Sequence, residues 1–376
     1  MDKSKKIIFK ILTGIFTLCF ILLCAEIFLR AINYPYTKVG WKSHGLPKES
    51  NKLGFRGQEI KFKSNEFVIL LLGDSQVESL ATTKDQMPEQ YLEKKLNQII
   101  PEVKIKVFSL GAGGYGQDQQ LLALEDYFNK YARADLVINW ITFTNDIWNN
   151  TFPTHFGKTP KPTFLLRDKV LVYPTEKEGQ YYPDTGILLF HFITRNITEK
   201  IYGRDQMWEA FLPSAGKQQL VPSDIAINED WQVMWDKGYL REENLKNEKT
   251  HFSLYLQPVS KRTLYGLDLT RALFSEMQKI CLKQKSQLMF FATDPLQNLD
   301  LNKEEYYSLN KVVYKTSNKT FRNNLDYLTK NFNFTFVTIS EPNPFVSDHD
   351  SHLNSKGVCA VMNELANEIA KKIFQK

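Results

Sequence analysis

One unbroken apolar stretch constrains the fold of this chain more than any other feature. Residues 67–72 read Phe-Val-Ile-Leu-Leu-Leu and run directly into Gly73-Asp74-Ser75. A short apolar run that stops at a turn signal is typical of a strand buried on both faces, as in a parallel sheet. Gly73 permits a tight exit from that strand. Ser75 is therefore predicted at the carboxyl edge of a sheet, where open α/β folds bind their ligands.

The stretches that follow predict a repeated alternation of helices and strands. Helical spacing of apolar residues is found at 87–100, 117–131, 262–285 and 355–374, and 303–329 is expected to be helical in long parts. Strands are expected at 103–110, 136–143, 287–292 and 334–339. Strands that alternate with helices predict right-handed crossovers and a central parallel sheet.

The N-terminal stretch predicts a membrane anchor at residues 1–32. Four lysines lie within residues 1–10, and residues 11–25 carry no charge. With its apolar continuation around Glu26 and Arg30, the span is close to the roughly 20 residues that a membrane helix needs. A cleaved signal peptide, the rival interpretation, would have a shorter apolar core and an Ala-x-Ala-like site. The lysines predict a cytoplasmic N-terminus and an extracytoplasmic remainder.

The rest of the chain is predicted to form a connector and one large domain. Residues 33–66 are polar and rich in turn residues, and residues 67–376 would form the domain. The alternation breaks at about 149–261, which we interpret as an insertion that caps or walls a cleft. Within the insertion we expect a hairpin turning at Arg167-Asp168 and short helices at 206–211 and 229–236.

Composition excludes several classes of function. The net charge is +6, and no basic stretch alternates with aromatic residues, so nucleic acid is not an expected partner. Four cysteines are too few for a disulfide scaffold. No Cys-x-x-Cys motif or His/Cys cluster indicates a metal.

Four loops carry polar residues that a plain core would not need, and their types suit acyl transfer. The loops contain Ser75, the glycine-rich 111–116, Asn145 and the segment 348–354. A serine hydroxyl needs a base to take its proton, and His352 could serve. A carboxylate two residues before that histidine could orient its ring. Backbone amides of Ser75 and of a loop glycine, with the Asn145 side chain, could stabilise an oxyanion.

A dinucleotide-binding loop is the competing interpretation of the second loop. Gly111-x-Gly113-x-x-Gly116 matches the fingerprint, follows a strand and opens a helix. That fingerprint usually follows the first strand of its unit, whereas this one follows the second. It also requires an acidic residue at the end of the next strand, and Asp135 stands at its beginning.

Taken together, the four blocks resemble the SGNH (GDSL) hydrolase superfamily. The first block is Gly73-Asp74-Ser75, the second is the glycine loop, the third is Asn145-Asp146, and the last is Asp-Ser-His-Leu-Asn at 350–354. Gly114 best matches the oxyanion glycine of the second block. Gly-Phe-Arg-Gly at 54–57 is similar to the lead-in of membrane-anchored bacterial members. The resemblance covers residues 67–146 and 334–374, about a third of the chain.

Two positions depart from the pattern of the family. Phe143 stands where the third block usually has glycine, a change expected to alter packing more than chemistry. His349 stands where the last block usually has aspartate, three residues before His352. Asp350 and Asp348 therefore compete for the orienting role, and Asp-x-His forms in related hydrolases and glycan O-acetyltransferases favour Asp350.

The resemblance implies a flavodoxin-like three-layer α/β/α sandwich behind one membrane helix. It implies a serine esterase or deacylase that cleaves an acyl or acetyl ester of an envelope glycan or lipid through an acyl-enzyme. Ser75 would be the nucleophile, His352 the base, and Asp350 the orienting carboxylate. No cofactor or metal is implied. The first alternative is an O-acyltransferase with an acyl-transfer partner in the membrane, and the second is a non-catalytic anchored binding module.

The same residues also have purely structural interpretations. Serine is a good helix cap, so capping the helix after its strand could be the whole role of Ser75. Asn145 could be a turn residue. Asp146 is expected to be structural, and His349 is expected to lie on the surface or behind the site.

Overall fold

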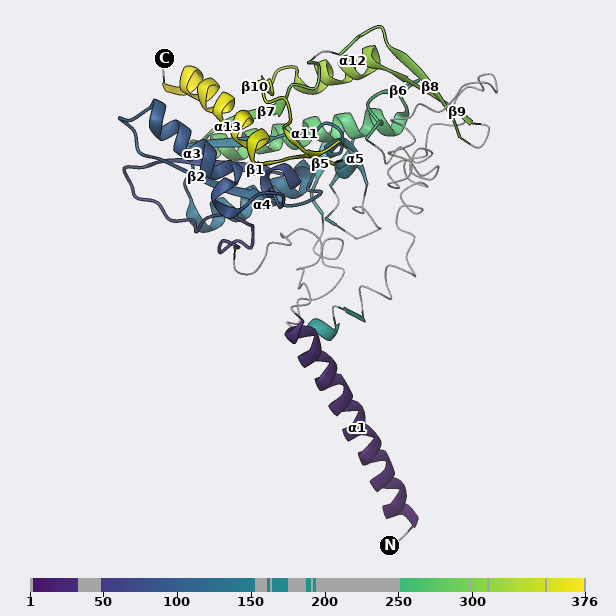
Figure 1. Ribbon diagram of the computed structural model, residues 1–376. Coiled ribbons are helices and arrows are strands. Elements are labelled where there is room, and N and C mark those ends of the chain that lie inside the picture. Colours follow the sequence, from purple (N-terminus) through teal and green to yellow (C-terminus); the bar gives the residue numbers. More distant parts are fainter. Residues whose placement is uncertain are drawn as a thin grey trace.

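The computed structural model of this chain describes residues 3–32, 49–152, 161–162, 164–174, 187–190, 192–193, 251–297, 299–309, 312–348 and 350–374. The chain begins with the long helix α1 (Lys3–Ala31), which stands away from the folded domain (Figure 1). The helices predicted at 206–211 and 229–236 lie outside the described residues.

A five-stranded parallel sheet forms the centre of the domain, which confirms the predicted fold. Its strands are β1 (Phe67–Gly73), β2 (Ile105–Gly111), β3 (Leu136–Trp140), β7 (Gln287–Thr293) and β10 (Phe334–Val337). The spatial order is β10-β7-β3-β1-β2, and each neighbouring pair is parallel. Numbered along the chain, this is the 2-1-3-4-5 order of flavodoxin-like folds. The carboxyl ends of β1, β2 and β3 therefore meet at one edge.

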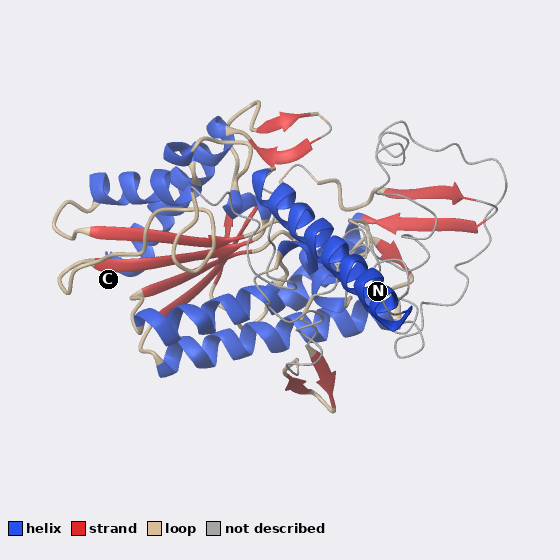
Figure 2. Ribbon diagram, turned by 90° about the horizontal axis from the view of Figure 1, so that it is seen from below, coloured by secondary structure: helices blue, strands red, loops and turns tan. Residues whose placement is uncertain are grey.

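Helices cover both faces of the sheet (Figure 2). One face carries α3 (Pro88–Ile99) and α13 (Ser355–Ile369), and the other carries α4 (Gln117–Tyr131) and α11 (Lys261–Lys283). Successive strand residues point to opposite faces. In β1, Val68, Leu70 and Leu72 pack with the α4–α11 layer, while Ile69 and Leu71 pack with the α3–α13 layer. The unbroken apolar run is thus the consequence of two buried faces.

Shorter elements connect and extend these layers. The helical ones are α2 (Ser75–Glu78), the 3₁₀ turn η1 (Lys84–Gln86), α5 (Asp146–Thr151), α12 (Asn318–Thr329) and the π turn η3 (Ala370–Phe374). The strands are β4 (Leu165–Arg167), β5 (Val170–Val172), β6 (Leu256–Gln257), β8 (Glu304–Leu309), β9 (Val312–Ser317), β11 (Phe345–Ser347) and β12 (Asp350–Leu353). β4 and β5 form the predicted antiparallel hairpin. Its turn residues Asp168 and Lys169 both have positive φ, as a type I′ turn requires.

The expectation of a largely helical 303–329 is wrong for its first half. Residues 304–317 form β8 and β9, which join β6 in a three-stranded antiparallel sheet, and only α12 is helical. Tyr306, Tyr307 and Tyr314, with the valines at 312–313, are residue types that favour strands. Helical spacing is weak evidence in so short a stretch, and the antiparallel pairing of β8 with β9 decides the outcome.

Part of the predicted connector packs into the core of the domain. Leu53, Phe55 and Ile60 are buried in the same cluster as the α4–α11 layer. Asn51 Oδ1 accepts hydrogen bonds from the backbone N–H of Leu53, at 2.9 Å, and of Phe55, at 3.3 Å. Residues from 49 onward therefore belong with the sheet, whereas the division of the chain into domains stays a prediction.

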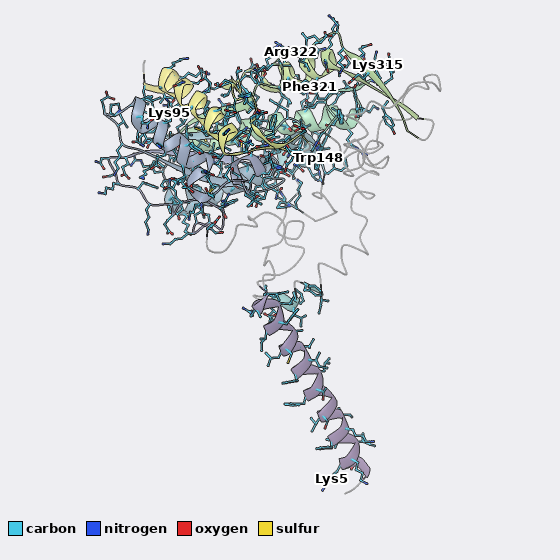
Figure 3. All side chains as sticks on the ribbon, viewed as in Figure 1. Lys5, Lys95, Trp148, Lys315, Phe321 and Arg322 are labelled. Atoms are coloured by element: carbon cyan, nitrogen blue, oxygen red, sulfur yellow. The ribbon has the colours of Figure 1, made fainter. Side chains whose placement is uncertain are left out.

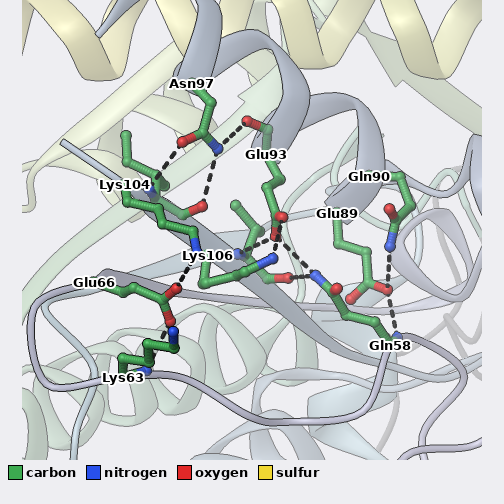
Figure 4. A network of polar contacts seen from close by, with 11 residues as sticks. Gln58, Lys63, Glu66, Glu89, Gln90, Glu93, Asn97, Lys104 and Lys106 are labelled. Atoms are coloured by element: carbon green, nitrogen blue, oxygen red, sulfur yellow. Dashed lines mark hydrogen bonds and ion pairs between the residues drawn. The ribbon is translucent and has the colours of Figure 1, made fainter. Parts of the chain in front are cut away.

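The buried carboxyl of Glu89 joins the segment before β1, at Gln58, to the sheet (Figure 4). Glu89, in the first turn of α3, accepts from Gln58 N–H at 2.6 Å through Oε1. Its Oε2 accepts from the N–H of Ser109 at 2.7 Å and from the hydroxyl of Ser109 at 2.8 Å. Gly57 is required here, because a Cβ would lie 2.8 Å from Ser109 Oγ. Burial raises the pKa of Glu89 to about 6, against the lowering effect of these donors.

Replacing Glu89 with glutamine should flatten the pH dependence of stability. Because the pKa is higher in the folded state, the wild type binds more protons folded than unfolded, and its free energy of unfolding falls as the pH rises from about 4.5 through 6. The shift corresponds to about 2 kcal/mol. The free energy of unfolding should be measured with urea for the full chain in detergent at pH 4.5 and at pH 7.5. Between these pH values the wild type should lose about 2 kcal/mol more than Glu89→Gln does.

Glu102, which is exposed, provides the matched control for this experiment. Glu102→Gln should follow the wild-type pH dependence. A Glu89→Gln variant that loses stability with pH as the wild type does would contradict the assignment to Glu89.

The helix α1 has the length and apolarity of a membrane span. Within Ser4–Ala31, an 18-residue window has a mean hydropathy of 2.5. Its side chains project outward along the helix, away from the folded domain (Figure 3). A signal sequence satisfies the same criteria of length and composition. The orientation of the helix in a membrane stays a prediction.

Candidate active site

Ser75 lies at the first position of α2, directly beyond the carboxyl end of β1. The residue that caps α2 is Asp74, whose side chain accepts from Gln76 N–H at 2.9 Å. Ser75 is thus not the helix cap, which leaves its hydroxyl without that structural role. Gly73 is needed because a Cβ there would lie 2.3 Å from Val77 Cγ2. The close approach of α2 to β1 holds Ser75 at the edge of the sheet.

The structure brings His352 and Asp350 to Ser75 from the far end of the chain. β11 and β12 form an antiparallel ribbon, and residues two apart on a strand share a face. His352 Nε2 lies 2.9 Å from Ser75 Oγ, and His352 Nδ1 lies 2.5 Å from Asp350 Oδ1. Asp350 Oδ1 also accepts from His352 N–H at 3.0 Å. This chain of hydroxyl, imidazole and carboxylate can activate a serine nucleophile.

The competing aspartate, Asp348, lies elsewhere. It is exposed in the turn between β11 and β12, and the contact with His352 Nδ1 is made by Asp350. His349, the other departure from the expected motif, lies outside the described residues. Asn354 accepts from Lys356 N–H and Gly357 N–H and so caps α13 immediately after β12.

Gln76 connects the helix that carries Ser75 to the strand that carries Asp350 and His352. Its Nε2 donates to the carbonyl of Ser351 at 3.2 Å, and its Oε1 accepts from Leu353 N–H at 3.2 Å. The side chain therefore spans from the residue after Ser75 to both neighbours of His352. No motif in the sequence singles out Gln76, because both of its partners are 275 or more residues away.

The glycine loop forms a tight turn beside α2. Tyr115 N–H donates to Ala112 O, and Gly114 at the third position has φ +73°, as a type II turn requires. The contact with α2 is made by Gly113, whose N–H donates to Glu78 Oε2 at 2.7 Å. Gly114 therefore has a conformational reason to be glycine, and its role toward an oxyanion stays a prediction. Sequence analysis did not single out Glu78.

Asn145 contacts the residue that precedes the serine. It lies at the start of α5, and its Nδ2 donates to Asp74 Oδ2 at 3.0 Å. Its Oδ1 is buried and has no hydrogen-bond partner within the described part of the chain. Asn145 is thus connected to the Ser75 turn through Asp74. Phe143 is buried and stacks on Phe334, with ring centroids 5.7 Å apart, so this departure from the motif has a packing role.

Several buried carboxyls surround the site. Burial raises the pKa of Asp74 and of Glu78, and hydrogen bonds from Gln76 N–H and Gly113 N–H oppose the rise. Burial, followed by the charge of Asp74, raises the pKa of Asp146 well above its usual value. Asp146 Oδ2 accepts from Thr142 N–H at 2.9 Å.

A second histidine, His251, lies close enough to His352 for their charges to interact. Its ring stacks on Trp148, with centroids 6.4 Å apart. Burial, followed by the charge of His352, lowers the pKa of His251 to about 4. A neutral histidine beside the site is suited to contact a substrate rather than to hold charge. Its position near the end of the predicted insertion gave no signal in the sequence.

Arg56, in the Gly-Phe-Arg-Gly segment, connects that segment to the C-terminal end of α2. Its guanidinium, almost fully buried, donates to the carbonyls of Glu78 and Thr82, at 3.0 and 2.7 Å, and also to that of Ser79. Its Nε forms an ion pair with Glu49 at 2.6 Å. Through these hydrogen bonds the Gly-Phe-Arg-Gly segment stabilises the position of α2, the helix that carries Ser75.

A cleft of about 500 Å³ borders the site at the carboxyl edge of the sheet. Gln76 and Ser351, the chain neighbours of Ser75 and His352, form part of its lining. The loops after β3, β7 and β10 form the rest and contribute the acidic residues Asp294 and Glu341. Among the described residues, no group of three or more His, Cys, Asp or Glu side chains could hold a metal ion.

No protein-family model and no curated protein matches this chain. Solved structures that resemble it are esterases and lipases. A lipase from a goat rumen metagenome is 10% identical over 80% of this chain and 96% of its own, with a TM-score of 0.36. An acetyl xylan esterase from the rumen bacterium Butyrivibrio proteoclasticus is 10% identical over 84% of this chain and 66% of its own, also with a TM-score of 0.36. A protein from Parabacteroides merdae described as a GDSL-like lipase is 12% identical over 81% and 97%, with a TM-score of 0.32. TM-scores this low lend no weight to a function.

Proposed function

We propose that this chain is a serine esterase or deacylase. The observation that carries the proposal is the unbroken series of contacts from Ser75 Oγ through the imidazole of His352 to Asp350, at 2.9 and 2.5 Å. Ser75 comes from the start of the sheet, and Asp350 and His352 come from one strand 275 or more residues later, and they meet in the order that nucleophilic catalysis requires. Asp350, rather than Asp348, is the proposed orienting carboxylate.

The reaction would proceed through an acyl-enzyme. Ser75 Oγ attacks the ester carbonyl while His352 Nε2 takes the hydroxyl proton, and Asp350 holds the ring and stabilises the imidazolium. The N–H of Ser75 belongs to the first turn of α2, whose N–H groups have no partner within the helix. With Gly114 N–H and the Asn145 amide, it would stabilise the oxyanion. His352 then donates the proton to the leaving alcohol, and water repeats the sequence to release the acid.

The cleft beside the site favours an alcohol portion that is neutral and polar. Its volume lies in the range of small-molecule sites. Its described lining is largely apolar, and its polar part holds the carboxylates of Asp294 and Glu341 with several threonines and includes no lysine or arginine. Carboxylates and hydroxyls pair well with the hydroxyls of a sugar and repel an anionic head group. An acyl or acetyl ester of a glycan is therefore the proposed substrate class.

The protein is proposed to act outside the cytoplasm as a single-pass membrane protein. The lysines at the start of α1 favour a cytoplasmic N-terminus, which would place the folded domain on the opposite side. α1 would then hold the cleft close to the envelope, where acylated glycans and lipids occur.

Labelling with a fluorophosphonate tests the chemistry directly. The full chain in detergent should form a covalent adduct that peptide mapping places on Ser75, because such probes capture activated serines. Product analysis with acetylated oligosaccharides should then show free acetate, in the presence and absence of a deacylated acceptor glycan. Transfer of the acetyl group to the acceptor would favour the O-acyltransferase, and absence of any adduct would favour a binding module.

A further inference from the structure

Residues 187–193 form an apolar segment within the insertion. They read Ile-Leu-Leu-Phe-His-Phe-Ile, and 188–190 and 192–193 are helical. Four of the apolar side chains are exposed: Ile187 by 49%, Phe190 by 37%, Phe192 by 40% and Ile193 by 41%. Single exposed apolar residues are common on protein surfaces, whereas a contiguous group of this size indicates an interaction surface.

This segment is attached to the end of α1 that leads into the domain. Leu188 N–H and Leu189 N–H donate to the two carboxylate oxygens of Glu26, at 3.1 and 2.7 Å. In Figure 1 the segment appears as the short teal helix beside that end of α1. Leu188 is buried at this junction, as is Leu29, the one buried residue in the described part of α1. The contacts fix the segment at the depth of the last turns of the helix.

The carboxylate of Glu26 explains why the junction is built from backbone donors. An acidic side chain near the end of a membrane helix is costly unless it is paired. Arg30 Nε donates to Glu26 Oε1 at 2.8 Å, and the two backbone N–H groups satisfy the remaining capacity of the carboxylate.

We infer that residues 187–190 and 192–193 lie in the lipid interface and form a second contact of this protein with its membrane. α1 is apolar and exposed along its length, so it needs lipid around it. A segment joined to its end through Glu26 reaches the same bilayer surface. Phenylalanine and isoleucine side chains on a short helix are suited to insertion at the boundary between head groups and acyl chains. The inference concerns attachment and is independent of the proposed chemistry.

Fluorescence quenching in phosphatidylcholine vesicles tests this placement. In the full chain with its four native cysteines replaced by serine, a cysteine introduced at Phe190 would carry an environment-sensitive fluorophore. Quenching by lipids that bear a spin label on the acyl chain should be several-fold stronger there than at the control position Leu282. Leu282 is 68% exposed on α11, within the folded domain. Emission at position 190 should also shift to the blue.

Equal quenching at positions 190 and 282 would overturn the inference. A blue shift at 190 without lipid quenching would also overturn it, because the side chain would then be covered by protein. Ile193→Cys provides a second reporter on the same segment, in case the first variant does not fold. The cysteine-free parent should elute and unfold as the wild type does before either reporter is compared.

Discussion

Ser75→Ala should abolish ester hydrolysis while leaving the protein folded. The expected loss is roughly 10⁴- to 10⁶-fold in kcat, as for other serine nucleophiles that act with a histidine. Stability should hardly change, because Asp74 and not Ser75 caps α2. The measurement is turnover of a short-chain aryl ester by the full chain in detergent, together with its melting temperature. The variant should also lose the fluorophosphonate adduct.

Ser64→Ala is the matched control for this variant. Ser64 is exposed in the turn before β1, and its backbone carbonyl accepts from Arg133 at 2.8 Å. Its loss should leave turnover within a few-fold of wild type. If Ser75→Ala retained full activity, the serine mechanism would be excluded, whatever the control showed.

Asp350→Asn should lower turnover by about 10⁴-fold, whereas Asp348→Asn should have little effect. Asp350 Oδ1 lies 2.5 Å from His352 Nδ1, and an amide in its place could present its NH₂ group to that nitrogen. The ring would then favour the tautomer with its proton on Nε2, which cannot accept the hydroxyl proton of Ser75. Asp348 is exposed in the preceding turn, so its charge reaches the ring mainly through solvent.

Both asparagine variants should be measured under one set of buffer and substrate conditions. The comparison is controlled internally, because each variant removes one carboxylate from the same short segment. A larger loss for Asp348→Asn than for Asp350→Asn would reverse the assignment of the carboxylate, although the serine and histidine could keep their roles.

The fold could be predicted because its signals are local. The apolar run of β1 and the helical spacing of α3, α4 and α13 each lie within one stretch of sequence, and their alternation permits few topologies. β8 and β9 were missed because so short a stretch fits helical spacing as well as strand alternation, and only their pairing with each other separates the two. The ribbon of β11 and β12 was also unforeseen, although it is what places Asp350 and His352 on one face.

The site could be predicted only as a set of residue types. Serine, histidine and aspartate are the residue types that nucleophilic catalysis uses. Ser75, His352 and Asp350 could therefore be predicted as site residues before any geometry was known. Gln76, Glu78 and His251 could not, because glutamine, glutamate and histidine occur in many structural settings. Their importance comes from particular distances to partners on other elements, and such distances leave no trace in a single sequence.

The support that Arg56 gives to α2 determines how the chain could be shortened. A soluble version that began at Phe67 would keep every strand of the central sheet. It would leave the carbonyls of Glu78, Ser79 and Thr82 without their buried donor, and it would open the space filled by Phe55. A version that began between residues 33 and 48 would keep both the hydrogen bonds of Arg56 and the side chain of Phe55. The boundary for a minimal active protein therefore lies at least eighteen residues ahead of the first core strand, from residue 49 to Phe67.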